Sequence, residues 1–114
     1  MKKSEIDRIR CDVYNDDPLR VRRVAEKMPD TKHLGRVADV LHALAHPVRV
    51  GIYTAISTEP LCVCELSTLL RMSPPALMYH LRILWEAGLI AVTKSGKFAE
   101  YRPVSEAAKE ILHL

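Results

Sequence analysis

The sequence predicts a mainly α-helical fold with a single β-hairpin, and three observations support this prediction. Apolar residues recur at helical spacing in successive segments from residue 31 to residue 88, and prolines separate these segments. Two of the predicted helices are joined by only three residues, which is typical of a helix-turn-helix. A hairpin pattern follows directly, so the predicted fold class is a winged helix-turn-helix.

The chain has 114 residues and a formal net charge of +3, and this length is enough for one small domain with a core. Its positive balance is concentrated in one third of the sequence, where the basic residues Arg71, Arg82, Lys94, Lys97 and Arg102 stand against only Glu86 and Glu100. This pattern favours a polyanion over a membrane as partner, because no apolar run approaches the length of a spanning helix. No cleavable leader precedes the first charges, so we expect a cytoplasmic protein.

We predict two regions in the chain. Residues 1–17 mix charges of both signs with few apolar positions, which predicts a flexible arm that carries Cys11. A proline then opens a short helix, and Pro29 stops this helix because proline cannot continue a helical ladder. Residues 1–29 are therefore expected to form an arm with an extra helix, and residues 30–114 to form the winged helix-turn-helix domain.

The first two helices of the larger region are predicted to form a tight pair. A helix from about residue 31 to residue 45 has one apolar face, made by Leu34, Val37, Leu41 and Leu44. Pro47 fits the first position of a second helix, whose apolar residues are Val48, Ile52 and Ile56.

The helix-turn-helix is predicted between Pro60 and Gly88. A short helix begins near Val63 and carries Leu66, Leu69 and Leu70, and residues 71–73 form the turn. Ser73 can cap the second helix through its hydroxyl group, and Pro74 fits its first position. The buried stripe of this second helix consists of Leu77, Leu81 and Leu84.

The wing is predicted from two strand patterns, residues 90–94 and 98–102, around a turn at residues 95–97. This hairpin carries cations near its tip. Ser105 is expected to cap a last helix that needs a partner surface for its apolar residues Ala107, Ala108, Ile111 and Leu112.

The second helix of the motif has an outward face that can enter a major groove of DNA, while the hairpin cations grip phosphates. The expected DNA contacts are Ser73, Ala76, Tyr79, His80, Arg82, Lys94, Lys97 and Arg102. Two alternatives stay open: a helical domain whose surface happens to be basic, and a packing role for His80 that is as well supported as a DNA contact. Trp85 and Tyr53 are interpreted as core or dimer aromatics.

Three cysteines are an odd number in a chain without a secretory signal, so we expect free, redox-active or metal-bound thiols. Residues two apart in a regular helix project about 200° apart, so Cys62 and Cys64 can share a small ion only at a helix end. With Cys62 at the cap, the positive helix terminus stabilises both thiolates. Together with Cys11 they form a three-sulfur set that suits As(III), Sb(III), Bi(III), Pb(II) or Cd(II). Either cysteine of the pair taken alone is equally well explained as a small core residue.

Five short motifs carry a family resemblance: Leu-Ala-His-Pro-Val-Arg at 44–49, Leu-Cys-Val-Cys-Glu-Leu at 61–66, Tyr-His-Leu-Arg at 79–82, Glu-Ala-Gly-Leu at 86–89, and Gly96-Lys97 followed by Tyr101. They resemble the ArsR/SmtB family of winged-helix metalloregulators over nearly the whole chain. The resemblance implies a homodimeric repressor that is not an enzyme, has no organic cofactor and leaves double-stranded operator DNA when a thiophilic ion binds. The implied ions are As(III), Cd(II) and Pb(II), and Cys11 would come from the other subunit.

The sequence departs from this family in two places. Cadmium and lead repressors of this type usually have a second cysteine in the arm, whereas only Cys11 is present here. A three-sulfur site favours As(III) or Pb(II), unless an oxygen from Asp12, Tyr14 or water completes a shell around Cd(II). The carboxyl-terminal zinc site of the family is not expected, because residues 105–114 offer only Glu106, Glu110 and His113.

Two other functions are alternatives to ion sensing. The same fold could respond to oxidants through a disulfide between Cys11 and Cys62 or Cys64. A small thiol oxidoreductase or arsenic-handling enzyme is disfavoured, because the chain lacks a Cys-x-x-Cys motif in a βαβ setting.

Overall fold

The computed structural model describes residues 3–104, with side chains from Glu5 onward. The chain divides into two compact units, Met1–Asp30 and Thr31–Leu114, and each is described by itself. The predicted cap at Ser105, the last helix and the carboxyl-terminal zinc ligands lie outside the described residues.

The first unit holds two short helices, α1 (Lys3–Arg8) and α2 (Pro18–Ala25). The amide groups of Leu19 and Arg20 donate to the Asp17 carboxylate, at 3.0 and 3.3 Å, so Asp17 caps α2. Helix α1 lies within the region predicted as a flexible arm, and its Glu5 and Arg8 have the charges that stabilise the two ends of a helix. Helix α2 ends at Ala25, before it reaches Pro29.

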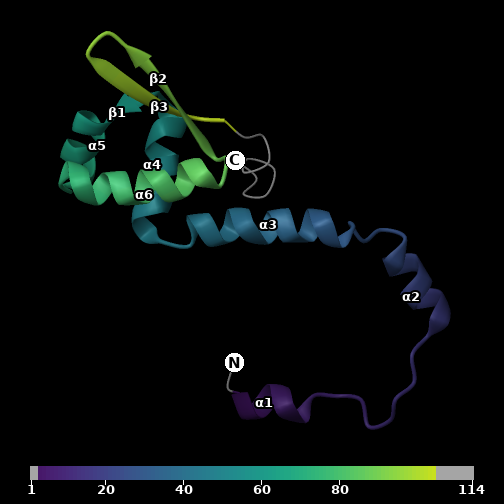
Figure 1. Cartoon of the computed structure of the whole chain (residues 1–114). Coiled ribbons are helices and arrows are strands. Elements are labelled where there is room, and N and C mark those ends of the chain that lie inside the picture. Colours follow the sequence, from purple (N-terminus) through teal and green to yellow (C-terminus); the bar gives the residue numbers. More distant parts are fainter. Residues whose placement is uncertain (1–2, 105–114) are drawn as a thin grey trace. The chain divides into compact units, whose positions relative to one another are not determined.

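The second unit contains four helices in its described part: α3 (Thr31–Leu44), α4 (Pro47–Thr58), α5 (Val63–Leu70) and α6 (Pro74–Glu86) (Figure 1). The predicted helix starts at Pro47, Val63 and Pro74 are confirmed. The core includes the predicted stripe of α6 and residues from every other helix of the unit, among them Leu44, Ile52, Tyr53, Ile56, Leu66, Leu77, Leu81 and Leu84.

Helix α3 differs from the prediction in the residues that it buries. Its buried residues are Val40, Ala43 and Leu44, all at its carboxyl-terminal end. Leu34 and Leu41 of the predicted stripe are 40% and 46% exposed, because only the end of α3 packs against the core of the described unit.

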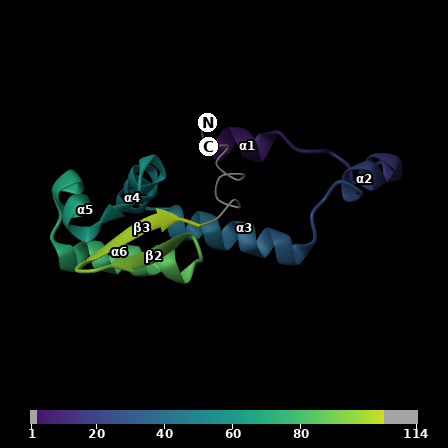
Figure 2. The ribbon, with the colours of Figure 1, turned by 90° about the horizontal axis from the view of Figure 1, so that it is seen from above.

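The wing is part of a three-stranded antiparallel sheet with the order β1-β3-β2. Strands β2 (Ile90–Ser95) and β3 (Phe98–Pro103) form the predicted hairpin, in which Ser95 pairs with Phe98 and Gly96 has a positive φ of 60°. Figures 1 and 2 show that the hairpin leaves the carboxyl-terminal end of α6 and runs back toward the end of the unit that holds α5. Strand β1 (Leu61–Cys62) was not predicted. No helix in the described part of the chain is long and apolar enough to cross a membrane.

Candidate DNA interface and cysteine pair

The outward face of α6 is exposed over most of the predicted DNA contacts. Tyr79 is 58% exposed, and Ala76 and Arg82 are exposed as well. The Ser73 hydroxyl accepts the amide of Ala76 at 3.3 Å, so this serine caps the helix as predicted. The face therefore combines a phenol and a guanidinium group, which can bind base edges or phosphates, with an exposed helix start.

The wing exposes the three predicted cations. Lys94 and Lys97 lie on either side of the turn, and both are exposed. Arg102 is exposed on β3, and its guanidinium donates a hydrogen bond to the hydroxyl of Thr93 across the hairpin. The hairpin thus holds its cations on a paired and twisted frame next to α6.

His80 is buried, with only 8% of its surface exposed. Arg49 Nη1 donates to His80 Nδ1 at 3.2 Å, and Arg49 Nε donates to the carbonyl oxygen of Ala43 at 2.6 Å. These bonds connect α6 to the start of α4 and the end of α3. The burial of His80 therefore favours the packing alternative over the expected DNA contact.

Burial lowers the pKa of His80 from its ordinary value of 6.5, and the nearby charges of His46 and Arg49 lower it further. The His46 ring lies 4.6 Å and the Tyr79 ring 5.1 Å from the His80 ring. Because the unfolded chain binds this proton more readily, the stability that neutral His80 contributes is present above about pH 6.5 and is lost as the pH falls below it.

The His80→Gln substitution keeps an acceptor for Arg49. We therefore expect its free energy of unfolding to fall less than that of the wild type when the pH is lowered from 7 to about 5.5. Urea unfolding at a series of pH values measures this slope, with His42→Gln as the control for removing an exposed histidine. Equal slopes for wild type and His80→Gln would show that His80 does not contribute.

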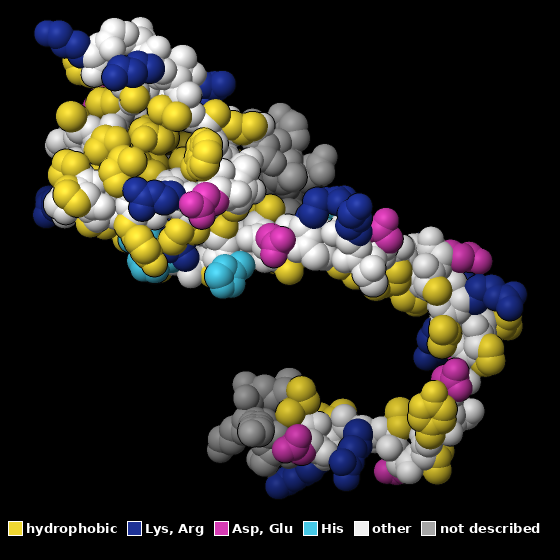
Figure 3. Space-filling view, in the orientation of Figure 1, with side chains coloured by type: hydrophobic (Ala, Val, Ile, Leu, Met, Phe, Trp, Pro, Cys, Tyr) yellow, Lys and Arg dark blue, Asp and Glu magenta, His cyan; other side chains and the backbone are white. Residues whose placement is uncertain are grey.

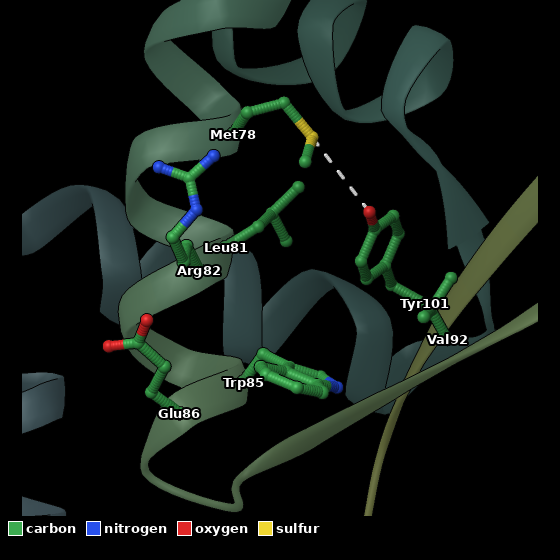
Figure 4. Close-up of a pocket in the computed structure, with 7 residues that line it drawn as sticks. All are labelled: Met78, Leu81, Arg82, Trp85, Glu86, Val92 and Tyr101. Carbon is green, nitrogen blue, oxygen red and sulfur yellow. Dashed lines mark hydrogen bonds between the residues drawn. The ribbon is translucent and has the colours of Figure 1, made fainter.

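A mainly apolar pocket of about 270 Å³ lies between α6 and the hairpin. Figure 4 shows Tyr101 and Val92 reaching into it from the strands, with Arg82 and Glu86 on the outer side of α6. The Tyr101 hydroxyl donates to the sulfur of Met78 at 3.8 Å. Figure 3 shows apolar side chains gathered over this face of the unit.

Trp85, which lines the pocket, is 57% exposed, whereas Tyr53 is a core residue as expected.

The two cysteines of the pair lie at the start of α5, as predicted. Cys62 is the N-cap residue, with φ of −88° and ψ of 169°, and Cys64 is in the first turn of the helix. Both thiols are free; Cys62 is half-buried and Cys64 is exposed. The two residues thus differ in backbone conformation, so the 200° relation of a regular helix does not apply between them.

Glu65 lies next to this pair, and its role was not predicted. The amide of Cys62 donates to Glu65 Oε1 at 3.0 Å. This bond, and a weaker one from the Cys62 thiol, lower the pKa of the Glu65 carboxyl below its ordinary value. The Cys62-x-x-Glu65 spacing is that of a capping box, a signal that the sequence already contained.

Cys62 also belongs to the wing sheet. It is the last residue of β1 and pairs with Glu100 of β3, while Leu61 pairs with Tyr101. Cys62 therefore connects the first helix of the helix-turn-helix to the hairpin that carries the cations.

Cys11 is exposed in the first unit. Among the described residues, no group of three or more histidine, cysteine, aspartate or glutamate side chains is arranged to hold a metal ion. The donor set at α5 is therefore a pair of thiols with soft-ion chemistry, which needs a further ligand to make a three-sulfur site.

Comparisons with known proteins agree with this architecture. A family model described as bacterial regulatory protein, arsR family, matches residues 46–92. A transcriptional repressor SmtB homolog from Synechocystis is 30% identical over 90 residues, which make up 75% of this chain and 68% of that protein. The chain belongs to the ArsR/SmtB family.

Two further relatives of this ArsR/SmtB chain bear on its function. The arsenical resistance operon repressor of Escherichia coli is 43% identical over 60 residues, 52% of this chain and 51% of that repressor. The homodimeric winged helix-turn-helix DNA-binding domain of a possible ArsR-family regulator from Mycobacterium bovis has a TM-score of 0.65 and 26% identity, over 75% of this chain and 82% of that chain. These relatives are transcription regulators by name, in agreement with the expectation that the chain is not an enzyme.

Proposed function

We propose that this protein is a homodimeric transcriptional repressor that binds operator DNA and leaves it when a thiophilic ion binds its cysteines. The observation that carries the proposal is the position of Cys62, which caps the first helix of the helix-turn-helix and pairs with the wing strand β3. A ligand at this residue acts on the wing strand β3 and on α5, the helix that packs against α6.

The proposed DNA contacts are those of α6 and the wing. Tyr79 and Arg82 read base edges in the major groove, and Ser73 and Ala76 lie at the helix start that approaches the backbone. The wing contacts phosphates through Lys94, Lys97 and Arg102. In a two-fold dimer, the two copies of α6 meet successive major grooves, and the operator half-sites lie about one helical turn apart.

The proposed effector is As(III), Pb(II) or Cd(II), bound by thiolates of Cys62 and Cys64 and by Cys11 of the second subunit. The free thiols of Cys62 and Cys64 at the start of α5 support this choice, because cysteine sulfur ligands select soft ions. Three sulfurs suit As(III) or Pb(II). A shell around Cd(II) takes one more oxygen from Asp12, Tyr14 or water.

Ion binding acts as an off-switch through the first turn of α5. Thiolates that close around an ion draw Cys62 and Cys64 together, which shifts α5 against α6 and pulls on the β1–β3 pairing. The coupling that this requires is modest, about 1–3 kcal/mol, because an allosteric linkage of that size changes DNA affinity by one to two orders of magnitude.

A titration of the DNA-bound protein tests this function. Fluorescence anisotropy of a labelled operator fragment is followed while As(III), Cd(II), Pb(II) or Zn(II) is added, and sulfur-to-metal absorption is recorded in parallel. We expect release by at least one of the first three ions, at the stoichiometry at which the absorption saturates. Release by peroxide in the presence of a chelator, without release by any ion, would instead support the thiol redox switch. The proposal fails if all ions bind and the DNA stays bound.

A further inference from the structure

We propose that Glu65 is a positioning residue of the cysteine site, which fixes the helix boundary at Cys62 so that its sulfur can meet that of Cys64. This inference rests on the proposed ion response and adds a residue to that site. Its basis is the hydrogen bond in which the Cys62 amide donates to Glu65 Oε1 at 3.0 Å.

The boundary matters because it decides in which directions the two sulfurs point. Cys62 has the extended conformation of a cap residue, whereas Cys64 is helical. If α5 began one residue earlier, Cys62 would join the helix and its side chain would project about 200° from that of Cys64. A small ion could not then bind both sulfurs without unwinding the helix.

Cys62 is a poor cap by its own chemistry. Helix caps are usually Ser, Thr, Asp or Asn, whose oxygens accept backbone amides, whereas a thiol sulfur is a weak acceptor. Helix α5 has only eight residues, and a helix of that length gains little stability from its own hydrogen bonds. The Glu65 carboxylate therefore supplies the contact from inside the helix that keeps Cys62 at the boundary.

The strand pairing of Cys62 supports the same assignment. Pairing with Glu100 on β3 holds the backbone of Cys62 extended from one side, and the bond to Glu65 holds it from the other. Glu65 Oε1 accepts the backbone amide of Cys62, so Glu65 acts on the ion through the cysteine, and the comparison of Glu65→Gln with Glu65→Ala separates this role from direct ligation.

Two substitutions at this position separate the cap from the charge. In Glu65→Gln, the amide oxygen can still accept the Cys62 amide, because glutamine occurs at this position of capping boxes. In Glu65→Ala, both the acceptor and the charge are lost. Glu86→Ala, which removes an exposed carboxylate at the end of α6, is the control for net charge.

Cd(II) affinity of the DNA-free dimer is measured by competition with a chelator, with sulfur-to-metal absorption as the readout. We expect Glu65→Ala to bind Cd(II) about fivefold more weakly than the wild type, the factor that corresponds to a typical capping interaction. Glu65→Gln and Glu86→Ala should bind as the wild type does. At saturation all four proteins should show the same absorption band, because the sulfur ligands are unchanged.

The proposal is overturned if Glu65→Gln binds as weakly as Glu65→Ala, since the charge would then act on the ion directly. It is also overturned if Glu65→Ala binds Cd(II) as well as the wild type or more tightly. Amide hydrogen exchange of Cys62 in the ion-free protein is the second measurement, and it should be faster in Glu65→Ala and unchanged in Glu65→Gln. If the wild type binds no ion, the proposed function fails, and the exchange rates alone decide whether Glu65 fixes the boundary.

Discussion

A Cys64→Ser protein is expected to bind operator DNA as the wild type does and to remain bound when As(III), Cd(II) or Pb(II) is added. Cys64 is exposed, so the change to serine removes a sulfur ligand without removing a core contact. Substitutions at such positions change stability by no more than about 0.5 kcal/mol. Ion affinity should fall by at least about 100-fold, because loss of an outer-shell partner alone costs roughly 10- to 100-fold at metal sites.

Anisotropy of a labelled operator, measured with and without ion, gives both quantities for Cys64→Ser. The ion-free affinity of the variant is the internal control, and it should agree with the wild type within about twofold, as expected for a surface substitution. If Cys64→Ser still releases DNA at the wild-type ion concentration, the pair at α5 is not the sensing site.

The elements that the sequence predicts correctly have short-range signals. The start of α6 is set by Ser73 and Pro74, which act on their own turn, and the apolar stripe of α6 is a property of one helix. The hairpin turn at Gly96 is equally local. For this reason the helix-turn-helix, the wing and the position of Cys62 could all be predicted without knowledge of the tertiary structure.

The features that were missed depend on residues far apart in the chain. Strand β1 has only two residues, and it forms because Leu61 pairs with Tyr101, which lies some forty positions later in the chain. His80 is buried because Arg49, from another helix, reaches its ring. Helical periodicity places His80 at the edge of the apolar face, and the side chain that covers this edge comes from a distant part of the sequence.

The structure also changes the interpretation of the cysteine pair. The sequence predicts two thiols at a helix end. The structure shows in addition that one of these residues, Cys62, is the last residue of a strand of the wing sheet. The proposed signal at Cys62 therefore has two physical routes to the proposed DNA contacts, one through α5 to α6 and one through β3. Both routes consist of directly bonded or packed elements.

A Leu66→Ala substitution is expected to destabilise the folded protein by about 2–5 kcal/mol, the usual range for removing a buried leucine side chain. Leu66 has no exposed surface and is the buried residue of α5, the helix that carries both cysteines. The loss leaves a cavity in the core and removes the main apolar contact of α5. Urea unfolding at a fixed protein concentration measures the change, since the stability of the proposed dimer depends on concentration.

Leu69→Ala is the matched control for this substitution, because Leu69 lies on the same helix and is 59% exposed. Its effect should stay within about 0.5 kcal/mol. A loss of less than about 1 kcal/mol in Leu66→Ala would mean that the core collapses around the cavity and that α5 is held by other contacts. A loss of about 2–5 kcal/mol would mean that the packing of Leu66 holds α5 firmly in the core. The proposed signal from Cys62 to α6 requires such a firmly held helix.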